Sequence, residues 1–405
     1  MKEIKPYILS NRIQPYEWGT RGRQAFIPKL LGMKYNDNLP YAELWMGTHP
    51  AAPSQVKISE QLLGLYELIK MYPVEFLGRL TYEHFGANLP FLFKVLSAGK
   101  ALSIQAHPDK SQAIRLHLND PGHYPDQNHK PEIAIAIDQL TALVGLLSPD
   151  LLTARLRQYS DIQRLVDVTL IDGKSGHVEN TGGKLRLFYR GLFQKVLSDP
   201  DNYQEIINQL EKKILTQKDQ KSEIEQTFLD LKQNHEPTDI GLIMPFFMNL
   251  VHLRSGEGLF ISAGIPHAYI SGNIIECMAN SDNVVRIGLT EKFKDIPALL
   301  EIMDYTAKPI EIIVPERLGG TRTYTTPVEE FSVKNIRISA NSVKVISTDD
   351  KIQIGLLLNG KIDLAWDQGN SITLAQGQSV VIPAGLGKYT IRAITNSELF
   401  IATTN

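Results

Sequence analysis

The sequence predicts a mainly β protein with two similar β-barrels and a helical insertion. Three observations support this prediction. Apolar and polar residues alternate with a period of two in several segments of the 405-residue chain, as expected for half-buried strands. Between residues 149 and 235 the apolar residues instead follow a helical spacing. Finally, residues 256–267 and 377–388 repeat one pattern of glycines, an isoleucine and an Ala-Gly turn, which indicates two copies of one β-turn-β unit.

These features divide the chain into three expected domains. Residues 1–148 and 236–328 are expected to form a catalytic β domain with flanking helices, residues 149–235 the helical insertion, and residues 329–405 a second β domain. Within the repeat, His267 of the first copy is replaced by Lys388 in the second. We therefore expect the second β domain to lack the ligands that the first one provides.

The composition excludes several classes of function. The 42 basic and 44 acidic residues give a formal charge of −2, which argues against binding to nucleic acid or to an anionic membrane. The single cysteine, Cys277, excludes an internal disulfide and a multi-cysteine metal site. Neither a signal peptide nor an apolar run long enough to span a membrane is apparent. We expect a cytoplasmic protein.

The segment from residue 101 to 110 carries the first group of candidate ligands. In a β-strand, Ser103, Gln105 and His107 share one face, and the residues between them form an apolar face. An ordinary half-buried strand would turn such a polar face to solvent. The other polar segments of the chain favour a functional interpretation.

The segment before it, residues 90–97, also has a strand pattern. It carries Lys94 in an otherwise apolar run, and a buried lysine needs an anionic partner or a ligand. Residues 98–100 are expected to form the turn of a hairpin that joins the two strands. Further upstream, residues 59–88 have helix-compatible apolar spacing.

A third strand, residues 132–137, places isoleucines on one face and Glu132 with small alanines on the other. Such a face suits the inside of a narrow barrel, where a metal or substrate takes the space. The candidate metal ligands are thus Gln105, His107, Glu132 and His267, and their nitrogen and oxygen donors suit zinc with one position left open. The alternative is structural, with His107 capping a turn and His267 satisfied at the mouth of the barrel.

Further polar residues favour a phosphate-binding site near the candidate metal ligands. Two tryptophans, Trp18 and Trp45, lie near glutamates that include Glu43, an arrangement common in sugar sites but also compatible with a packed loop. The other polar candidates combine cations that can donate to phosphate oxygens with carboxylates and a hydroxyl. They are Lys94, Ser103, Lys130, Glu276, Asp282, Arg286 and Lys292.

Several sequence blocks together resemble the type I mannose-6-phosphate isomerases, a family also called phosphomannose isomerases. The resemblance runs in order over nearly the whole chain, and the helical insertion is the part that matches poorly. One small departure is Glu291, where the family often has Pro or Ser. The blocks are Tyr41–His49, Leu92–Ser97, Leu102–Lys110, His129–Glu132, Ala263–Tyr269 and Asn280–Lys292.

The resemblance implies a cupin-type β-barrel enzyme, hence a bicupin, that uses one Zn²⁺ per chain to interconvert mannose 6-phosphate and fructose 6-phosphate. The zinc ligands of the family fall on Gln105, His107, Glu132 and His267, and its active-site arginine falls on Arg286. We expect a monomer whose partner is a small sugar phosphate. The residues expected to contact the substrate are Trp18, Glu43, Lys94, Ser103, Tyr269 and Lys292.

The expected mechanism is proton transfer between C1 and C2 through a cis-enediol. The base stays open among Glu276, Asp282 and Lys130. Two other functions fit the pattern less well. In an iron-dependent cupin dioxygenase, Gln105 would fill the position that oxygen needs. A sugar-phosphate-binding protein without catalysis would have no use for intact metal ligands.

Overall fold

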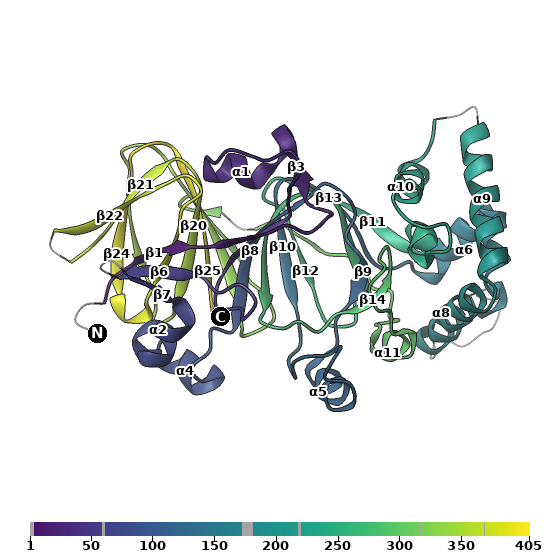
Figure 1. Ribbon diagram of the computed structural model, residues 1–405, viewed down its shortest axis with the longest axis horizontal. Coiled ribbons are helices and arrows are strands. Elements are labelled where there is room, and N and C mark those ends of the chain that lie inside the picture. The colour runs from purple at the N-terminus through teal and green to yellow at the C-terminus, as the bar shows by residue number, and fades with distance from the viewer. Residues whose placement is uncertain (1–3, 59–60, 172–180, 218–219, 316, 368) are drawn as a thin grey trace.

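The computed structural model describes residues 4–58, 61–171, 181–217, 220–315, 317–367 and 369–405. Two β regions lie next to each other along the long axis, and a group of helices lies at the far end of the central one (Figure 1). The prediction of a mainly β protein is confirmed. Among the described residues, no helix combines the length and the apolar character that crossing a membrane requires.

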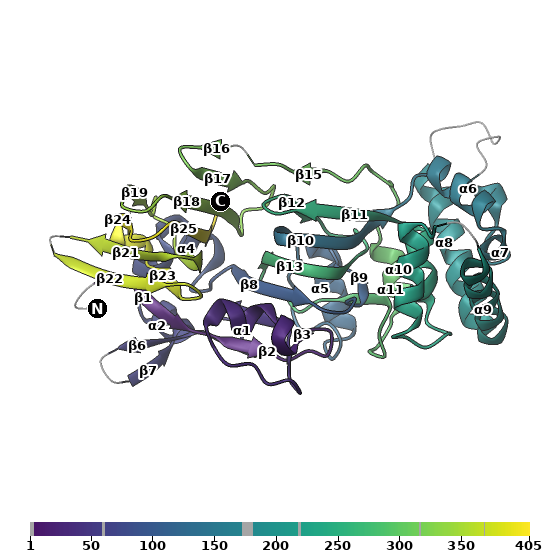
Figure 2. The same cartoon turned by 90° about the horizontal axis from the view of Figure 1, so that it is seen from above.

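A ten-stranded antiparallel sheet occupies the middle of the molecule (Figure 2). Its main path runs β15 (Ile312–Ile313), β12 (Gly258–Ile261), β10 (Glu132–Leu146), β13 (His267–Ala279), β8 (Phe91–Ala98), β5 (Glu43–Met46) and β2 (Arg12–Gln14). Off this path, β11 (Met248–Arg254) pairs with β10, and β9 (Ile104–Ala106) pairs with both β13 and β14 (Val285–Gly288).

The second β region combines a nine-stranded sheet with a four-stranded one, and apolar side chains from both pack between them. The nine strands follow the order β16 (Arg317–Leu318), β17 (Thr321–Tyr324), β18 (Ser332–Ile338), β25 (Ser397–Thr403), β20 (Gln353–Asn359), β23 (Ser379–Ile382), β1 (Tyr7–Ser10), β6 (Gln55–Ile58) and β7 (Gln61–Gly64). The four are β19 (Val343–Ser347), β24 (Lys388–Ala393), β21 (Lys361–Trp366) and β22 (Asn370–Ala375). A separate pair joins β3 (Thr20–Arg21) to β4 (Pro40–Tyr41).

N-terminal strands are thus part of the sheet that the C-terminal segment builds, since β1 pairs with β23. Among the described residues, the end strands of each hydrogen-bonded path do not pair with each other. The expectation of two closed barrels is therefore not confirmed by the strand pairing.

The predicted β-turn-β repeat is confirmed. In the first copy β12 leads through a turn into β13, and in the second β23 leads into β24. Gly256 and Gly377 occupy equivalent positions, and both have a left-handed backbone with φ of 82° and 79°. His267 is the first residue of β13 and is buried, whereas its counterpart Lys388 is the first residue of β24 and is exposed.

The predicted hairpin at residues 98–100 is wrong. Strands β8 and β9 both pair with β13, with Ala98 opposite Gly272 and Gln105 opposite His267, so they run in the same direction along it. The intervening chain does not reverse, because the Leu102 N–H donates to the Tyr269 carbonyl at 2.9 Å and keeps the segment beside β13. Both candidate strands consequently lie on the same side of β13.

The helix expected over residues 59–88 begins later than predicted. Residues 59–60 lie outside the described residues, and Leu62 and Leu63 belong to the hairpin of β6 and β7. The helices that follow are α2 (Leu65–Met71), α3 (Pro73–Leu77) and α4 (Arg79–Phe85). Other short helices in the β regions are η1 (Gly22–Gln24), α1 (Phe26–Leu31), α5 (Lys110–Asn119), α11 (Ile296–Ile302) and η5 (Ala384–Leu386).

Helices form in the predicted helical insertion, residues 149–235. Within it, residues 172–180 and 218–219 lie outside the described residues. The helices are α6 (Pro149–Gln158), α7 (Ser160–Gln163), η2 (Val168–Leu170), α8 (Thr181–Ser198), α9 (Pro200–Thr216) and α10 (Glu223–Lys232), followed by η4 (Ile240–Phe246). Ser148 caps α6 and Ser222 caps α10 by accepting backbone N–H groups, as such residues do at helix starts.

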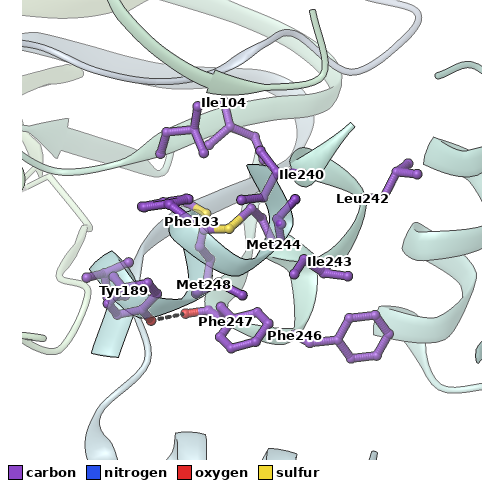
Figure 3. Packing of buried hydrophobic residues seen from close by; sticks show 14 of the residues in the cluster. Ile104, Tyr189, Phe193, Ile240, Leu242, Ile243, Met244, Phe246, Phe247 and Met248 are labelled. Atoms are coloured by element: carbon purple, nitrogen blue, oxygen red, sulfur yellow. Dashed lines mark hydrogen bonds between the residues drawn. The ribbon is translucent and has the colours of Figure 1, made fainter. Parts of the chain in front are cut away.

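The helices share a hydrophobic core with the strands that carry the candidate ligands. Figure 3 shows this core, in which the Tyr189 hydroxyl donates to the Phe247 carbonyl at 3.2 Å. The same cluster includes Ile104 of β9 and Ile287 of β14. The apolar face of β9 therefore packs on the helical side, and Gln105, between Ile104 and Ala106, points the other way.

Candidate metal centre and active site

Strand register brings residues that are distant in sequence onto one rung of the sheet. Gln105 lies directly opposite His267 of β13 on one side and opposite Arg286 of β14 on the other. A second rung places Lys94 of β8 opposite Glu276 of β13. Because side chains on one rung point to the same face, both groups face a common space.

Three predicted ligands meet at one point. His107, Glu132 and His267 are all at most 2% exposed, and one ligand atom from each lies within 4.8 Å of the others. The His107 Nε2 lies 3.4 Å from Glu132 Oε1, and the His267 Nε2 lies 3.3 Å from Glu132 Oε2. The side chain of Gln105 completes the group, with its amide nitrogen 3.5 Å from the His267 Nε2.

The hydrogen bonds of the two imidazoles show which atoms face the centre. The His107 Nδ1 is 2.9 Å from the Asn283 carbonyl and the His267 Nδ1 is 3.0 Å from the Ile265 carbonyl, so each Nδ1 carries the proton and donates it. Each Nε2 then presents a bare lone pair to a carboxylate oxygen. Two electron-rich atoms at this distance repel each other unless a cation lies between them.

Buried atoms without partners lead to the same conclusion. The His107 Nε2 and the Glu132 Oε2 are buried and have no hydrogen-bond partner within the described ranges. Burial lowers the pKa of His107 to about 4, against the opposing effect of Glu132, and so favours the neutral ring that binds metals. Burial alone would raise the pKa of Glu132, but the two histidines and Lys130 outweigh it and lower that pKa well below its usual range.

The donor set fits zinc. Two imidazole nitrogens and one carboxylate oxygen are usual zinc ligands. The hydrogen bond from each Nδ1 to a backbone carbonyl orients the imidazole ring, as in known zinc sites. The Gln105 side chain can supply an amide oxygen, since the two ends of a glutamine amide are interchangeable by rotation. A single carboxylate would leave the centre with a net positive charge.

A charged group lies on the second rung beside the centre. The Lys94 ammonium is 2.9 Å from Glu276 Oε2 and 3.7 Å from Glu43 Oε2, and all three side chains are buried. Burial alone would lower the pKa of Lys94, but Glu276 and Glu43 outweigh it, so the pKa is raised and the lysine stays protonated. The Trp45 indole N–H donates to Glu43. This hydrogen bond explains why the two residues lie close together in the sequence.

A cavity of about 510 Å³ opens over both rungs, within the range of ~300–1,000 Å³ usual for small-molecule sites. Apart from His107 and His267, every predicted site residue contributes to its wall. These residues are Trp18, Glu43, Lys94, Ser103, Gln105, Lys130, Glu132, Tyr269, Glu276, Asp282, Arg286 and Lys292. The structure thus brings the whole predicted set together.

Three cations of the wall, Lys100, Arg286 and Lys292, have no anionic partner among the described residues. In the described part of the chain the Arg286 guanidinium makes no hydrogen bond or ion pair, and burial lowers its pKa. Lys292 lies over the ring of Tyr16, 5.8 Å from its centre, and burial likewise lowers its pKa. The Tyr269 hydroxyl is buried and has no hydrogen-bond partner from the residues that the structure describes. These groups are available to a ligand.

The wall also contains residues that were not among those predicted from the sequence, and the polar ones include Tyr16, His49, Lys100 and His235. His235 lies just after α10. The helical insertion, residues 149–235, therefore also contributes to the wall of the cavity. His49 closes the block that resembles the family, and this block is the signal that could have found it.

Fold and site together define a β-sheet protein with a buried His-Glu-His centre of the kind that holds a metal ion, beside a polar cavity. The model of the phosphomannose isomerase type I catalytic domain matches residues 7–147. The mannose-6-phosphate isomerase of Mus musculus is 35% identical over 413 residues, covering 94% of this chain and 96% of the relative. That of Schizosaccharomyces pombe is also 35% identical, over 390 residues covering 92% and 93%.

Solved structures agree. A crystal structure of a zinc-bound mannose 6-phosphate isomerase matches with a TM-score of 0.84 and 28% identity, covering 99% of both chains. A variant of phosphomannose isomerase from Salmonella typhimurium matches with a TM-score of 0.86 and 27% identity, covering 99% of both chains. The chain belongs to the type I mannose-6-phosphate isomerase family, as its sequence blocks predict.

Proposed function

We propose that this protein is a zinc-dependent isomerase that interconverts mannose 6-phosphate and fructose 6-phosphate. The observation that carries the proposal is the pair of bare imidazole nitrogens, of His107 and His267, directed at the single carboxylate of Glu132. The names of the relatives and the zinc bound in a similar structure support it.

One zinc ion per chain would be held by Gln105, His107, Glu132 and His267. When bound, the ion would polarise the substrate's carbonyl and stabilise negative charge on its oxygen. Arg286 is opposite Gln105 in the strand register, and its guanidinium has no ion-pair partner in the ranges that the structure describes. We assign to Arg286 the stabilisation of the same developing negative charge. A fixed cation stabilises such a charge more in a cavity that excludes part of the water than it does in bulk water.

The phosphate group requires cations that are not already neutralised. Lys94 is paired with Glu276 and Glu43, so its charge is largely offset. Lys292 and Lys100 line the cavity without an anionic partner in the described part of the chain, and Ser103 adds a hydroxyl. We therefore assign the phosphate to Lys292, Lys100 and Ser103, and the sugar ring atoms to Trp18 and Tyr269.

The reaction moves a proton from C2 of the aldose to C1 of the ketose, through a cis-enediol. Of the three candidate bases, Asp282 is the one whose side chain is half exposed, and it lines the cavity. Its pKa is lowered chiefly by a hydrogen bond from His49. Glu276 is bonded to Lys94, and the Lys130 ammonium lies 3.7 Å from Glu132. We assign proton removal at carbon to Asp282, and the proton exchange at O1 and O2 to the Lys94–Glu276 pair and Lys130.

The same proposal extends to the architecture. We infer two cupin-like units, because the repeated β-turn-β segments begin at equivalent glycines, Gly256 and Gly377. The catalytic unit would comprise residues 1–148 and 236–328, the insertion residues 149–235, and the ligand-free unit residues 329–405. A cytoplasmic monomer acting on a free sugar phosphate, without nucleic acid or membrane, completes this picture.

A coupled assay that detects fructose 6-phosphate formed from mannose 6-phosphate tests the proposal directly. We expect turnover that chelation removes and added zinc restores. Elemental analysis of the purified protein separates the other functions. Iron together with oxygen uptake would identify a dioxygenase, and tight sugar-phosphate binding without turnover would identify a binding protein.

A further inference from the structure

We propose that His49 is a positioning residue that holds the carboxylate of Asp282 in one orientation at the wall of the cavity. The inference deepens the proposed function, in which Asp282 takes the proton from carbon. The two residues come from different parts of the chain, the loop after β5 and the loop between β13 and β14. His49 is otherwise unused in the proposed reaction.

The contact is direct, and its donor can be assigned. The His49 Nε2 lies 3.1 Å from Asp282 Oδ1. The other ring nitrogen, Nδ1, accepts the backbone N–H of Ala51 at 3.3 Å, so the proton of the ring is on Nε2. His49 therefore donates to Asp282, and the second carboxylate oxygen has no hydrogen-bond partner among the described residues.

The surroundings of His49 hold the ring in place. The side chain is 5% exposed, whereas that of Asp282 is 54% exposed. The Trp45 ring packs edge-on against the imidazole at 4.7 Å between centres. The loop itself is closed by two hydrogen bonds, from the Ser54 N–H to the Gly47 carbonyl and from the Gly47 N–H to the Ser54 hydroxyl.

The loop of Asp282 is anchored from the opposite side. The Asp282 backbone N–H donates to Asp126 Oδ2 at 2.8 Å, and the side chains of Ser281 and Asn283 on either side also donate to Asp126. The backbone of Asp282 is thus fixed by one partner and its side chain by His49. Such a double restraint keeps a reacting group within the narrow range of geometry that proton transfer needs.

Other charged groups near Asp282 act in known directions. The hydrogen bond from His49 is the largest influence that lowers the pKa of Asp282, and Lys130 and Lys94 lower it further. Partial burial opposes them, and the carboxylate of Asp126 lies on its backbone side. Tyr16 lies in the same cavity wall, and burial chiefly, with Glu43 and Asp282 adding to it, raises the pKa of its phenol. Removal of His49 should therefore raise the pKa of Asp282 without abolishing its ionisation.

The test compares two variants of the zinc-loaded full-length enzyme. His49→Phe keeps the ring volume but removes the donor, and His49→Gln keeps an N–H in nearly the same place. We expect His49→Phe to lower kcat roughly 10-fold, as loss of an orienting partner typically does, with zinc content unchanged and KM little affected. The acidic limb of the pH–kcat profile should move to higher pH. His49→Gln should restore part of the lost kcat and part of the original pH profile.

Two measurements keep this inference separate from the proposed function. In an Asp282→Asn background, His49→Phe should have no further effect on kcat. A ¹³C NMR titration of the Asp282 carboxyl reports its pKa whether or not the enzyme turns over mannose 6-phosphate, and His49→Phe should raise that pKa because the hydrogen bond that lowers it is lost. His84→Phe, which removes an exposed histidine beside Glu329, is the matched control.

Each outcome is decisive. An unchanged carboxyl titration together with an unchanged pH profile in His49→Phe would overturn the inference, even in an active isomerase. If the wild-type enzyme has no isomerase activity, the proposed function fails, and the titration alone decides whether His49 holds Asp282.

Discussion

Gln105 lies directly opposite His267 in the pairing of β9 with β13, although 162 positions separate them in sequence. The pairing exists because residues 99–103 carry the chain onward along β13 instead of reversing it. One rung of a sheet thus supplies an amide and an imidazole to the same centre, and Glu132 and His107 join them from neighbouring segments.

Replacement of Glu132 tests this centre. Glu132→Gln keeps the shape of the side chain but removes the single negative charge between the two histidines. We expect zinc content to fall and isomerase activity to drop by at least ~100-fold, since even outer-shell partners of a metal can be worth that much. Elemental analysis and the coupled assay check both. Glu311→Gln changes an exposed glutamate and is the control; full zinc and full turnover in Glu132→Gln would refute the assignment.

Arg286 separates metal binding from catalysis. Its guanidinium lies on the rung of Gln105 but contacts none of the three metal-site residues through a hydrogen bond or ion pair. Arg286→Ala should therefore retain zinc while kcat falls by about 10²–10³-fold, the usual cost of removing one stabilising donor. Arg337→Ala, on the distant β18, should leave both unchanged. Loss of zinc in Arg286→Ala would instead assign a structural role to the arginine.

Lys94 should contribute to stability as well as to the reaction. Lys94→Met removes the buried ammonium and leaves Glu276 and Glu43 unpaired, so we expect a loss of roughly 3–5 kcal/mol in the free energy of unfolding. Urea denaturation measures it. Adding Glu276→Gln should recover part of the loss, because a neutral side chain costs less to bury. A stability unchanged in the single variant would contradict the proposed pairing.

The sign of the pH dependence of Lys94→Met follows from Glu276. Burial raises the pKa of this carboxyl, and removal of Lys94 removes the group that opposes the rise. A group whose pKa is raised in the folded state stabilises it at low pH, and this contribution is lost as pH rises through the folded pKa. The deficit of Lys94→Met should therefore be larger at pH 7 than at pH 5.

Metal removal should make the protein sensitive to acid. Burial lowers the pKa of His107 to about 4 in the folded state, below its usual value of 6.5. The unfolded chain then binds more protons between these values, so stability falls as pH falls through this window, by on the order of 3 kcal/mol in full. Urea unfolding of chelator-treated protein at pH 7 and pH 5 measures the effect. A stability independent of pH in this window would contradict the prediction, and His107→Phe should reduce the dependence.

Local sequence was sufficient for several parts of the protein. The isoleucine and alanine faces of β10 are separated as predicted, because the period of a strand depends only on its backbone geometry. The helix start at Ser148 follows from side-chain capping, which is also local. The repeat with His267 and Lys388 at equivalent strand starts was likewise readable in the sequence.

Only the tertiary structure decided which segments meet. Residues 98–100 have the composition of a hairpin turn. The Gly99 and Lys100 N–H groups instead donate to the Trp18 carbonyl, and the Leu102 N–H that follows donates to the Tyr269 carbonyl, so the chain continues along β13. Leu62 and Leu63 fit a helical spacing, yet they pair in a hairpin with β6. Such outcomes depend on hydrogen bonds to distant strands, and no short window of sequence contains them.

The site divides in the same way. Residue type and spacing, with the family resemblance, named the candidate ligands and twelve residues of the cavity wall in advance, because metals and phosphates require particular donor atoms. The proton positions on His107 and His267 and the contact of His49 with Asp282 came only from the fold, since each depends on the placement of a backbone carbonyl or a neighbouring loop. The sequence by itself determined which atoms are offered, and the tertiary structure determined which of them face one another.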